Sequence, residues 1–243
     1  NRLFLFDRND KYSERNQYWK SNLQDSQRDF TDLSTKKILI LGDSVGKDFY
    51  ISAISSTSLA EEYQFRYVDF DDECMNINAM SQKQNFNCTN MYNFLTKSKL
   101  LDDADIVILS AHWGKRSWKN PLVMAEALPA QTEIRIIGSF KVAETSSIAM
   151  HSAQNGYRFD EMSRFAYKTL SEDYAYSERI SEEISEISRI TYFDKLEIFC
   201  NKLEEKCEFF DKKYGYPFIW DNMHITLEGR ELFARWIQKE VLK

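Results

Sequence analysis

The run of residues 36–44, KKILILGDS, is the feature that most constrains the fold of this chain. Residues 38–41 are all apolar, and two of the four are β-branched, which is typical of a short strand buried on both faces of a sheet. Gly42 permits a tight turn, and a helical pattern follows over residues 45–54. Ser44 is therefore predicted to lie at the open end of a buried strand, where a helix begins and its free N–H groups favour an anion.

The rest of the chain alternates between strand and helix patterns. Because such alternation implies right-handed crossovers and parallel strands, we expect a three-layer α/β fold with a flavodoxin-like parallel sheet of about five strands. Residues 36–41 and 104–111 are expected to be adjacent in this sheet. Further strands are predicted at residues 63–70, 134–138 and 190–194, and helices at 91–101, 121–128, within 160–187, and in a closing segment with Leu232, Phe233, Trp236 and Ile237 on its apolar face.

Residues 1–35 precede this pattern and differ from it in composition. They are mostly polar and charged, with aromatic residues spaced through them, and we expect an N-terminal extension or linker that packs on the domain formed by residues 36–243. The apolar residues 3–6 could pack on something outside this sequence. Because the chain begins with Asn1 rather than Met, we expect it to be a piece of a longer protein.

Composition excludes several classes of function. The net charge is −6, acidic and basic residues are interspersed, and no Lys/Arg-rich block occurs, which argues against a nucleic-acid partner. No apolar run approaches the roughly 20 residues of a membrane span, and no signal peptide is visible. Hydrophobic residues make up 43% of the chain, which is enough for a packed core.

A second motif, Asp221-Asn222-Met223-His224, stands near the end of the chain. A nucleophilic serine needs a general base, and that base needs a carboxylate to orient it; Asp-x-x-His in one loop can supply both. The alternatives are that Asp43 or Ser44 only caps a helix and that His224 is a surface histidine. His151 has no such partner and is expected to be structural or exposed.

Several polar residues follow the predicted strands. Asp69, His112 and Ser139 each stand where a strand ends, as Ser44 does. Because sites in parallel sheets lie beyond the carboxyl ends of the strands, we expect these residues at one edge of the sheet.

The four cysteines form two local pairs in the sequence, Cys74 with Cys88 and Cys200 with Cys207. Four cysteines allow three connectivities. No Cys-x-x-Cys spacing or neighbouring histidine suggests a metal site. From spacing alone, four buried thiols and two local disulfides both remain open.

With an early Gly-Asp-Ser and a late Asp-x-x-His before the last helix, the sequence resembles the SGNH (GDSL-type) hydrolases. The resemblance implies that Ser44 is the nucleophile, His224 the general base and Asp221 its orienting carboxylate, with no cofactor or metal. The family's Gly-x-Asn-Asp after the third strand is replaced by residues 110–113, Ser-Ala-His-Trp, and its glycine after the second strand is missing. The oxyanion site is therefore expected to be non-standard. The Ser44 N–H is the first candidate donor, and the further candidates for oxyanion or substrate contacts are Asp43, Asp69, His112 and Trp113.

A narrower resemblance accounts for these departures. Over about residues 36–240 the chain is similar to the SGNH domains fused to acyltransferase-3 membrane proteins of bacterial envelopes, which also lack the Asn and carry cysteine pairs at these places. The resemblance implies the disulfides Cys74–Cys88 and Cys200–Cys207 and a periplasmic location. It also implies O-acetylation of a surface polysaccharide, with a glycan acceptor, an acetyl donor and a membrane acyltransferase domain in the parent chain.

Two alternatives are carried alongside this interpretation. A free-standing carbohydrate acetylesterase would use the same residues with water as acceptor, and a catalytically idle glycan-binding module would need none of them. Activity on an activated acetyl ester separates the two classes. The sequence does not specify the glycan, the hydroxyl position or the acyl group.

Overall fold

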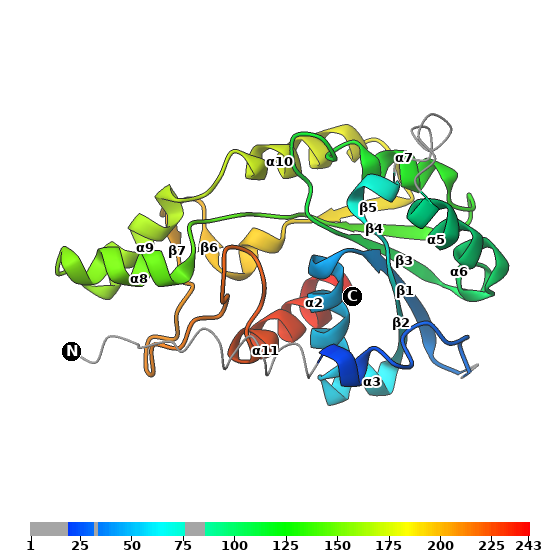
Figure 1. Cartoon of the computed structure of the whole chain (residues 1–243), viewed down its shortest axis with the longest axis horizontal. Coiled ribbons are helices and arrows are strands. Elements are labelled where there is room, and N and C mark those ends of the chain that lie inside the picture. The colour runs from blue at the N-terminus through cyan, green and yellow to red at the C-terminus, as the bar shows by residue number, and fades with distance from the viewer. Residues whose placement is uncertain (1–18, 32–33, 76–85) are drawn as a thin grey trace.

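Five parallel strands form one sheet at the centre of the computed structural model, which describes residues 19–31, 34–75 and 86–243 (Figure 1). The strand order is β2-β1-β3-β4-β5. Ile38 pairs with Ile106, so the segments expected to be adjacent are neighbouring parallel strands. The flavodoxin-like fold prediction is confirmed. The strands are β1 (Lys36–Gly42), β2 (Tyr63–Asp69), β3 (Ile106–Ser110), β4 (Glu133–Ile137) and β5 (Ile190–Phe193).

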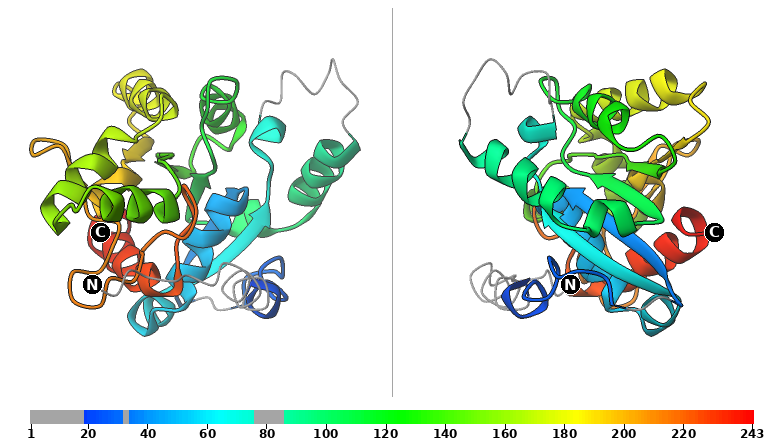
Figure 2. Two further views of the ribbon diagram at one scale, coloured as in Figure 1. Left: turned by 60° about the vertical axis from the view of Figure 1, so that its left-hand side comes forward. Right: turned by 90° about the vertical axis from the view of Figure 1, so that its right-hand side faces the viewer.

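Helices cover both faces of this sheet and complete the three layers (Figure 2). One face packs against α2 (Ser44–Ile54) and α11 (Leu227–Trp236), which continues into η3 (Ile237–Val241). The other face packs against α5 (Phe86–Lys97), α6 (Leu100–Asp103), α7 (Asn120–Ala127) and α10 (Asp173–Ile184). Within the described ranges, no helix is long and apolar enough to cross a membrane.

Some helices differ from the sequence prediction. The predicted helix at residues 91–101 begins earlier, as α5, and breaks before α6. The region 160–187 is divided into α9 (Phe159–Lys168) and α10 by residues 169–172. Two helices were not predicted, α3 (Thr57–Glu62) and α8 (Thr145–Gln154). Ser146 and Ser147 lie in the first turn of α8, where helices tolerate serine.

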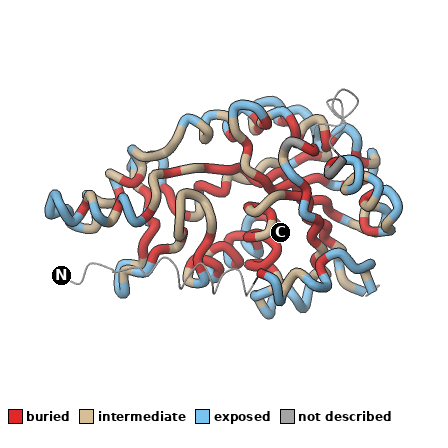
Figure 3. The backbone as a smooth tube through the Cα atoms, viewed as in Figure 1, coloured by how far each residue is buried: buried red, intermediate tan, exposed pale blue. Residues whose placement is uncertain are grey.

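The strands at the centre are buried on both sides, as their apolar runs predict. Ile38 and Ile40 point into the layer that contains α2, whereas Leu39 and Leu41 point into the layer that contains α5. All four are fully buried, and Figure 3 shows the central strands as a continuous buried region. Burying each such side chain stabilises the fold by about 1.5–3 kcal/mol relative to leaving it exposed.

The turn between β1 and α2 passes very close to the end of β3. A Cβ atom on Gly42 would lie 1.8 Å from the carbonyl oxygen of Ser110, and one on Gly46 would lie 2.5 Å from the same oxygen. Only glycine fits at Gly42, because the obstructing atom belongs to a backbone within the sheet. This close approach determines where Ser44 lies relative to the end of β3.

The described part of the N-terminal segment packs along β2. The backbone N–H of Tyr67 donates to the carbonyl oxygen of Ser26 (2.9 Å), and the Nε of Arg66 donates to the carbonyl oxygen of Arg28 (2.8 Å). These contacts cover an edge strand of the sheet. Residues 19–31 thus lie along β2, and the rest of the predicted extension, residues 1–18 and 32–33, lies outside the described residues.

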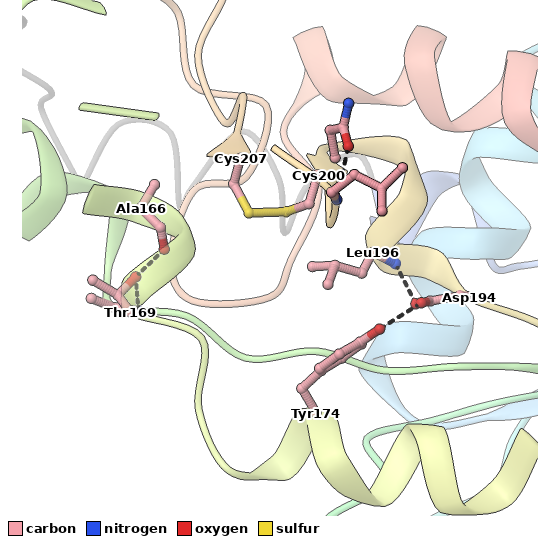
Figure 4. Close-up of a disulfide and its surroundings, with 10 residues drawn as sticks. Ala166, Thr169, Tyr174, Asp194, Leu196, Cys200 and Cys207 are labelled. Carbon is pink, nitrogen blue, oxygen red and sulfur yellow. Dashed lines mark hydrogen bonds between the residues drawn. A yellow bond between two sulfur atoms is a disulfide. The ribbon is translucent and has the colours of Figure 1, made fainter. Parts of the chain in front are cut away.

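Both expected disulfides are present in the structure. Cys74–Cys88 joins η1 (Asp72–Met75) to α5. Cys200–Cys207 joins β6 (Cys200–Asn201) to β7 (Lys206–Cys207), a two-stranded antiparallel pair directly after η2 (Lys195–Ile198) (Figure 4). The paired cysteines are 14 and 7 residues apart in the sequence.

Gly42→Ala tests the close approach of β1 to β3. Because the new methyl group cannot avoid a backbone oxygen, we expect the free energy of unfolding to fall by about 3 kcal/mol or more. Urea denaturation followed by circular dichroism measures it. Gly114→Ala is the control, since its Cβ would lie no closer than 3.4 Å to a neighbouring atom. Equal stability of the two variants would contradict the interpretation.

Peptide mapping without reduction tests the disulfides. We expect Cys74 linked to Cys88 and Cys200 linked to Cys207, and the recovery of free thiols or crossed pairs would refute this. Replacing Cys200 and Cys207 together by serine should lower the free energy of unfolding by about 2–4 kcal/mol in the chain-entropy model, because the unfolded chain regains its freedom.

Candidate active site

Ser44 lies where the sequence predicts it, at the first position of α2 directly after β1. The Asp43 carboxylate caps the helix, since its Oδ1 accepts the N–H of Val45 at 2.7 Å. The hydroxyl oxygen of Tyr67 lies 2.9 Å from the carbonyl oxygens of both Gly42 and Asp43 and supports the turn from the side of β2. The N–H of Ser44, at the start of the helix, needs no partner within α2.

Asp43 also connects the turn to β3. Its second oxygen, Oδ2, accepts the backbone N–H of His112 at 3.1 Å. Both carboxylate oxygens of Asp43 therefore accept backbone N–H groups. Asp43 is not an oxyanion donor, because an ionised carboxylate repels a negative charge. The alternative that Asp43 or Ser44 only caps a helix is thus correct for Asp43. It does not apply to Ser44, whose hydroxyl points towards His224.

His224 brings the two ends of the chain together. Its Nε2 lies 2.8 Å from the Oγ of Ser44, and its Nδ1 lies 2.6 Å from the Oδ2 of Asp221. A carboxylate next to Nδ1 favours the tautomer with its proton there, which leaves Nε2 free to accept the serine proton. The geometry is that of a serine activated by an oriented histidine.

Asp221 is the most strongly hydrogen-bonded member of this group. Its Oδ1 accepts the backbone N–H groups of Met223 and His224, each at 2.9 Å. Burial raises the pKa of the Asp221 carboxyl, but the bonds from the His224 ring and from these backbone groups outweigh it and place the pKa well below its usual range. Asp221 is therefore ionised at neutral pH, as orientation of His224 requires.

The loop that carries Asp221 and His224 is anchored on both sides. The N–H of Thr145 donates to the carbonyl oxygen of Asp221 (3.1 Å), and the N–H of Val142 donates to that of Asn222 (3.0 Å). On the other side, the N–H of Ile225 donates to the Oδ2 of Asp48 (3.0 Å), a buried carboxylate on α2. Asp48 was not identified from the sequence. An acidic residue next to the apolar residues 49–51 of a buried helix could have indicated a buried carboxylate with a structural or functional role.

An aromatic residue of the N-terminal segment also contacts His224. The ring of Trp19 lies edge-on to the imidazole, with 6.2 Å between centroids, and Trp19 is buried. The Nζ of Lys47 lies 5.1 Å from the centroid of the Trp19 ring and 3.4 Å from the Oδ2 of Asp69. Asp69 thus lies at the expected edge, but it is exposed and paired with Lys47.

The remaining candidates have different surroundings. The backbone N–H of His112 donates to Asp43, so it is not an oxyanion donor. The Nε2 of the His112 ring lies 3.4 Å from the Oδ2 of Asp173 on α10. Trp113 is fully buried; its Nε1 donates to the carbonyl oxygen of Ile137 (2.8 Å) and its N–H to the Oγ of Ser139 (2.8 Å). This corrects the expectation for Trp113, which cannot contact a substrate and instead connects β3 to β4.

Other sequence expectations concern histidines and metals. His151 lies on α8, where its ring stacks on that of Phe165 with 4.1 Å between centroids, in agreement with a structural role. In the part of the chain that the structure describes, no three His, Cys, Asp or Glu side chains are grouped so that they could bind a metal ion.

Comparisons with known proteins agree with this architecture. A family model described as the SGNH domain fused to AT3 domains matches residues 10–239. No curated protein sequence matches the chain. The periplasmic domain of the lipopolysaccharide acetyltransferase of Salmonella ser. Paratyphi A is similar in structure, with a TM-score of 0.67, 11% identity and 98% of both chains covered. A protein from Streptococcus pneumonia, described as a candidate platelet activating factor, matches with a TM-score of 0.50 and 12% identity, covering 95% of this chain and 94% of that one. At these identities the likeness shows the fold alone.

A fluorophosphonate probe, which reacts with activated serines, tests the geometry directly. We expect a single adduct on Ser44 in intact-mass and peptide analysis, and none in Ser44→Ala. His224→Ala should slow labelling by about 100-fold or more, because the general base is lost. Asp221→Asn should slow it less, since His224 remains but loses its orientation.

The matched control is His151→Ala, which removes a histidine outside the site and should label at the normal rate. Circular dichroism confirms that each variant is folded. Full labelling of folded His224→Ala would contradict the proposed activation of Ser44.

Proposed function

We propose that this chain, which belongs to the family of SGNH domains fused to AT3 domains, transfers an acyl group through Ser44. The observation that carries the proposal is the continuous hydrogen-bonded series from Ser44 Oγ through His224 to Asp221, with distances of 2.8 and 2.6 Å. Three residue types in these relative positions form the catalytic unit of serine acyl transfer on several unrelated folds.

The first half-reaction forms an acyl-serine. Ser44 Oγ bonds to the acyl carbon while its proton passes to Nε2 of His224, and the carbonyl oxygen becomes an oxyanion beside the N–H of Ser44 at the positive end of α2. Asp221 stabilises the imidazolium that forms. When the intermediate collapses, the bond to the leaving group breaks and the leaving group takes the proton from His224.

The second half-reaction releases the acyl group. An acceptor hydroxyl gives its proton to His224 Nε2 and attacks the acyl carbon, and the intermediate expels Ser44 Oγ, which recovers the proton. Water can serve as acceptor in the same geometry, which would make the product a free acid. Transfer and hydrolysis therefore use identical residues, and only the binding of the acceptor decides between them.

The acyl group is proposed to be acetyl and the acceptor a bacterial surface polysaccharide. Two comparisons support this. The family model is described as an SGNH domain fused to AT3 domains, and the Salmonella protein of similar fold is a lipopolysaccharide acetyltransferase periplasmic domain. On this proposal the chain is the periplasmic part of a membrane acyltransferase. The membrane domain of that protein delivers the acetyl donor, and Ser44 passes the acetyl group to a glycan hydroxyl.

The test uses cells that carry the parent protein with Ser44→Ala. We expect the mass of the surface polysaccharide to lose its acetyl increment, whereas His151→Ala cells should retain it. In parallel, the isolated chain should hydrolyse p-nitrophenyl acetate slowly, and Ser44→Ala and His224→Ala should each remove most of that activity. The double variant should be little worse than either, because the residues act as one unit.

The outcomes separate the alternatives. Unchanged acetylation in Ser44→Ala cells would reject the transferase role. If ester hydrolysis by the isolated chain still required Ser44, the acetylesterase would take its place. An isolated chain without any Ser44-dependent hydrolysis, together with unchanged acetylation, would leave the glycan-binding module.

A further inference from the structure

Trp19 is a buried tryptophan of the N-terminal segment that contacts the proposed general base. It is 9% exposed, and its ring lies edge-on to the His224 imidazole, with 6.2 Å between the ring centroids and 65° between the ring planes. It belongs to the cluster of buried side chains that also contains Phe49 of α2 and Ile225, the residue after His224. The N-terminal segment therefore contributes a core side chain at the candidate active site.

Lys47 is a second neighbour of the Trp19 ring. It lies on α2 three positions after Ser44, so both side chains leave the helix on the same side. Its Nζ lies 5.1 Å from the centroid of the Trp19 ring and 3.4 Å from the Oδ2 of Asp69, and the Lys47 side chain is only 16% exposed. The face of an aromatic ring attracts a cation, so Lys47 holds the indole against α2. Trp19 thus contacts both the helix that begins with Ser44 and the base that serves it.

Hydrogen bonds fix the segment that carries Trp19. The N–H of Leu23 donates to the carbonyl oxygen of Trp19 (3.1 Å), and the N–H of Ser26 donates to that of Leu23 (3.2 Å). The carbonyl oxygen of Ser26 in turn accepts the N–H of Tyr67 on β2 (2.9 Å). The hydroxyl of Tyr67 donates to carbonyl oxygens of the turn that leads into Ser44. The position of Trp19 is therefore tied to the turn that also places the nucleophile.

The two hydrogen bonds of the His224 ring leave one of its motions weakly restrained. The bonds to Asp221 and Ser44 act at the two ring nitrogens, and they do little to resist tilting of the ring about the line that joins these atoms. A second ring packed against the imidazole resists this tilt. It also excludes water that would compete with the Ser44 hydroxyl for Nε2, and the His224 side chain is only 14% exposed.

Building on the catalytic role proposed for His224, we propose that Trp19 is a positioning residue supplied by the N-terminal segment. Its ring holds the imidazole in line with the Oγ of Ser44 and shields it from water. Trp19 acts through His224, and the segment that carries it is part of the active site rather than only a connection to it.

Trp19→Ala, made in the whole chain, tests this with p-nitrophenyl acetate. We expect kcat to fall by about 10- to 100-fold and KM to change by less than about twofold, because a base that tilts out of line slows proton transfer but leaves substrate binding intact. Trp19→Phe keeps an aromatic ring against His224 and should hold kcat within about threefold of the wild type. Trp118→Ala is the control and should keep kcat, since Trp118 is a partly buried tryptophan of the opposite helical layer.

The decisive measurement is the labelling of Ser44 by the fluorophosphonate probe with and without the base. In the wild-type background, Trp19→Ala should slow labelling by about 10- to 100-fold. In the His224→Ala background there is no imidazole to hold, so the same substitution should slow labelling by less than about twofold. A tryptophan that only stabilises the fold around Ser44 would slow labelling equally in both backgrounds.

Each result decides for or against the proposal. Equal slowing in both backgrounds overturns it, as does full kcat in folded Trp19→Ala, a loss confined to KM, or a Trp19→Phe variant no more active than Trp19→Ala. If Trp19→Ala does not fold, Trp19→Leu, which keeps apolar bulk without the ring, takes its place in the same measurements. If Ser44→Ala is as active as the wild type, the proposed function fails; if Ser44→Ala is inactive and Trp19→Ala is fully active, only the Trp19 proposal fails.

Discussion

Acceptance of backbone N–H groups by carboxylates is the interaction on which the site depends. Ser44 and His224 are 180 residues apart and meet at 2.8 Å. Asp43 joins the turn after β1 to the end of β3, and Asp48 joins α2 to the segment after His224. Asp221 closes the loop on itself. Each of these carboxylates binds a backbone N–H group. The positions of the Ser44 and His224 side chains therefore follow from the positions of the backbone segments, which the sheet makes rigid.

Three carboxylates close together in a partly buried site repel one another and lose hydration. Each bond from a backbone N–H offsets part of that cost, and the low pKa of Asp221 shows that the bonds it accepts outweigh its burial. The close contact of Gly42 with Ser110 limits how far the turn that carries Asp43 can move.

The fold could be predicted because its central strands are buried on both faces. Residues 38–41 and 106–109 are continuous apolar runs, which carry a strong signal, and parallel order follows from their alternation with helices. The helices were predicted less well. α8 and α3 are short, and their serine and threonine residues resemble those of loops, so tertiary packing rather than local pattern makes them helical.

The sequence by itself determined β1, the position of Ser44 at the start of the following helix and the pairing of Asp221 with His224, because each depends on residues within a few positions of one another. Only the tertiary structure decided the rest. It buried Trp113, Asp48 and Lys195, paired the N–H of His112 with Asp43, and placed Trp19 against His224. These contacts join residues that are distant in the sequence, and a local pattern cannot specify a partner that only folding brings within hydrogen-bond or ring-contact distance.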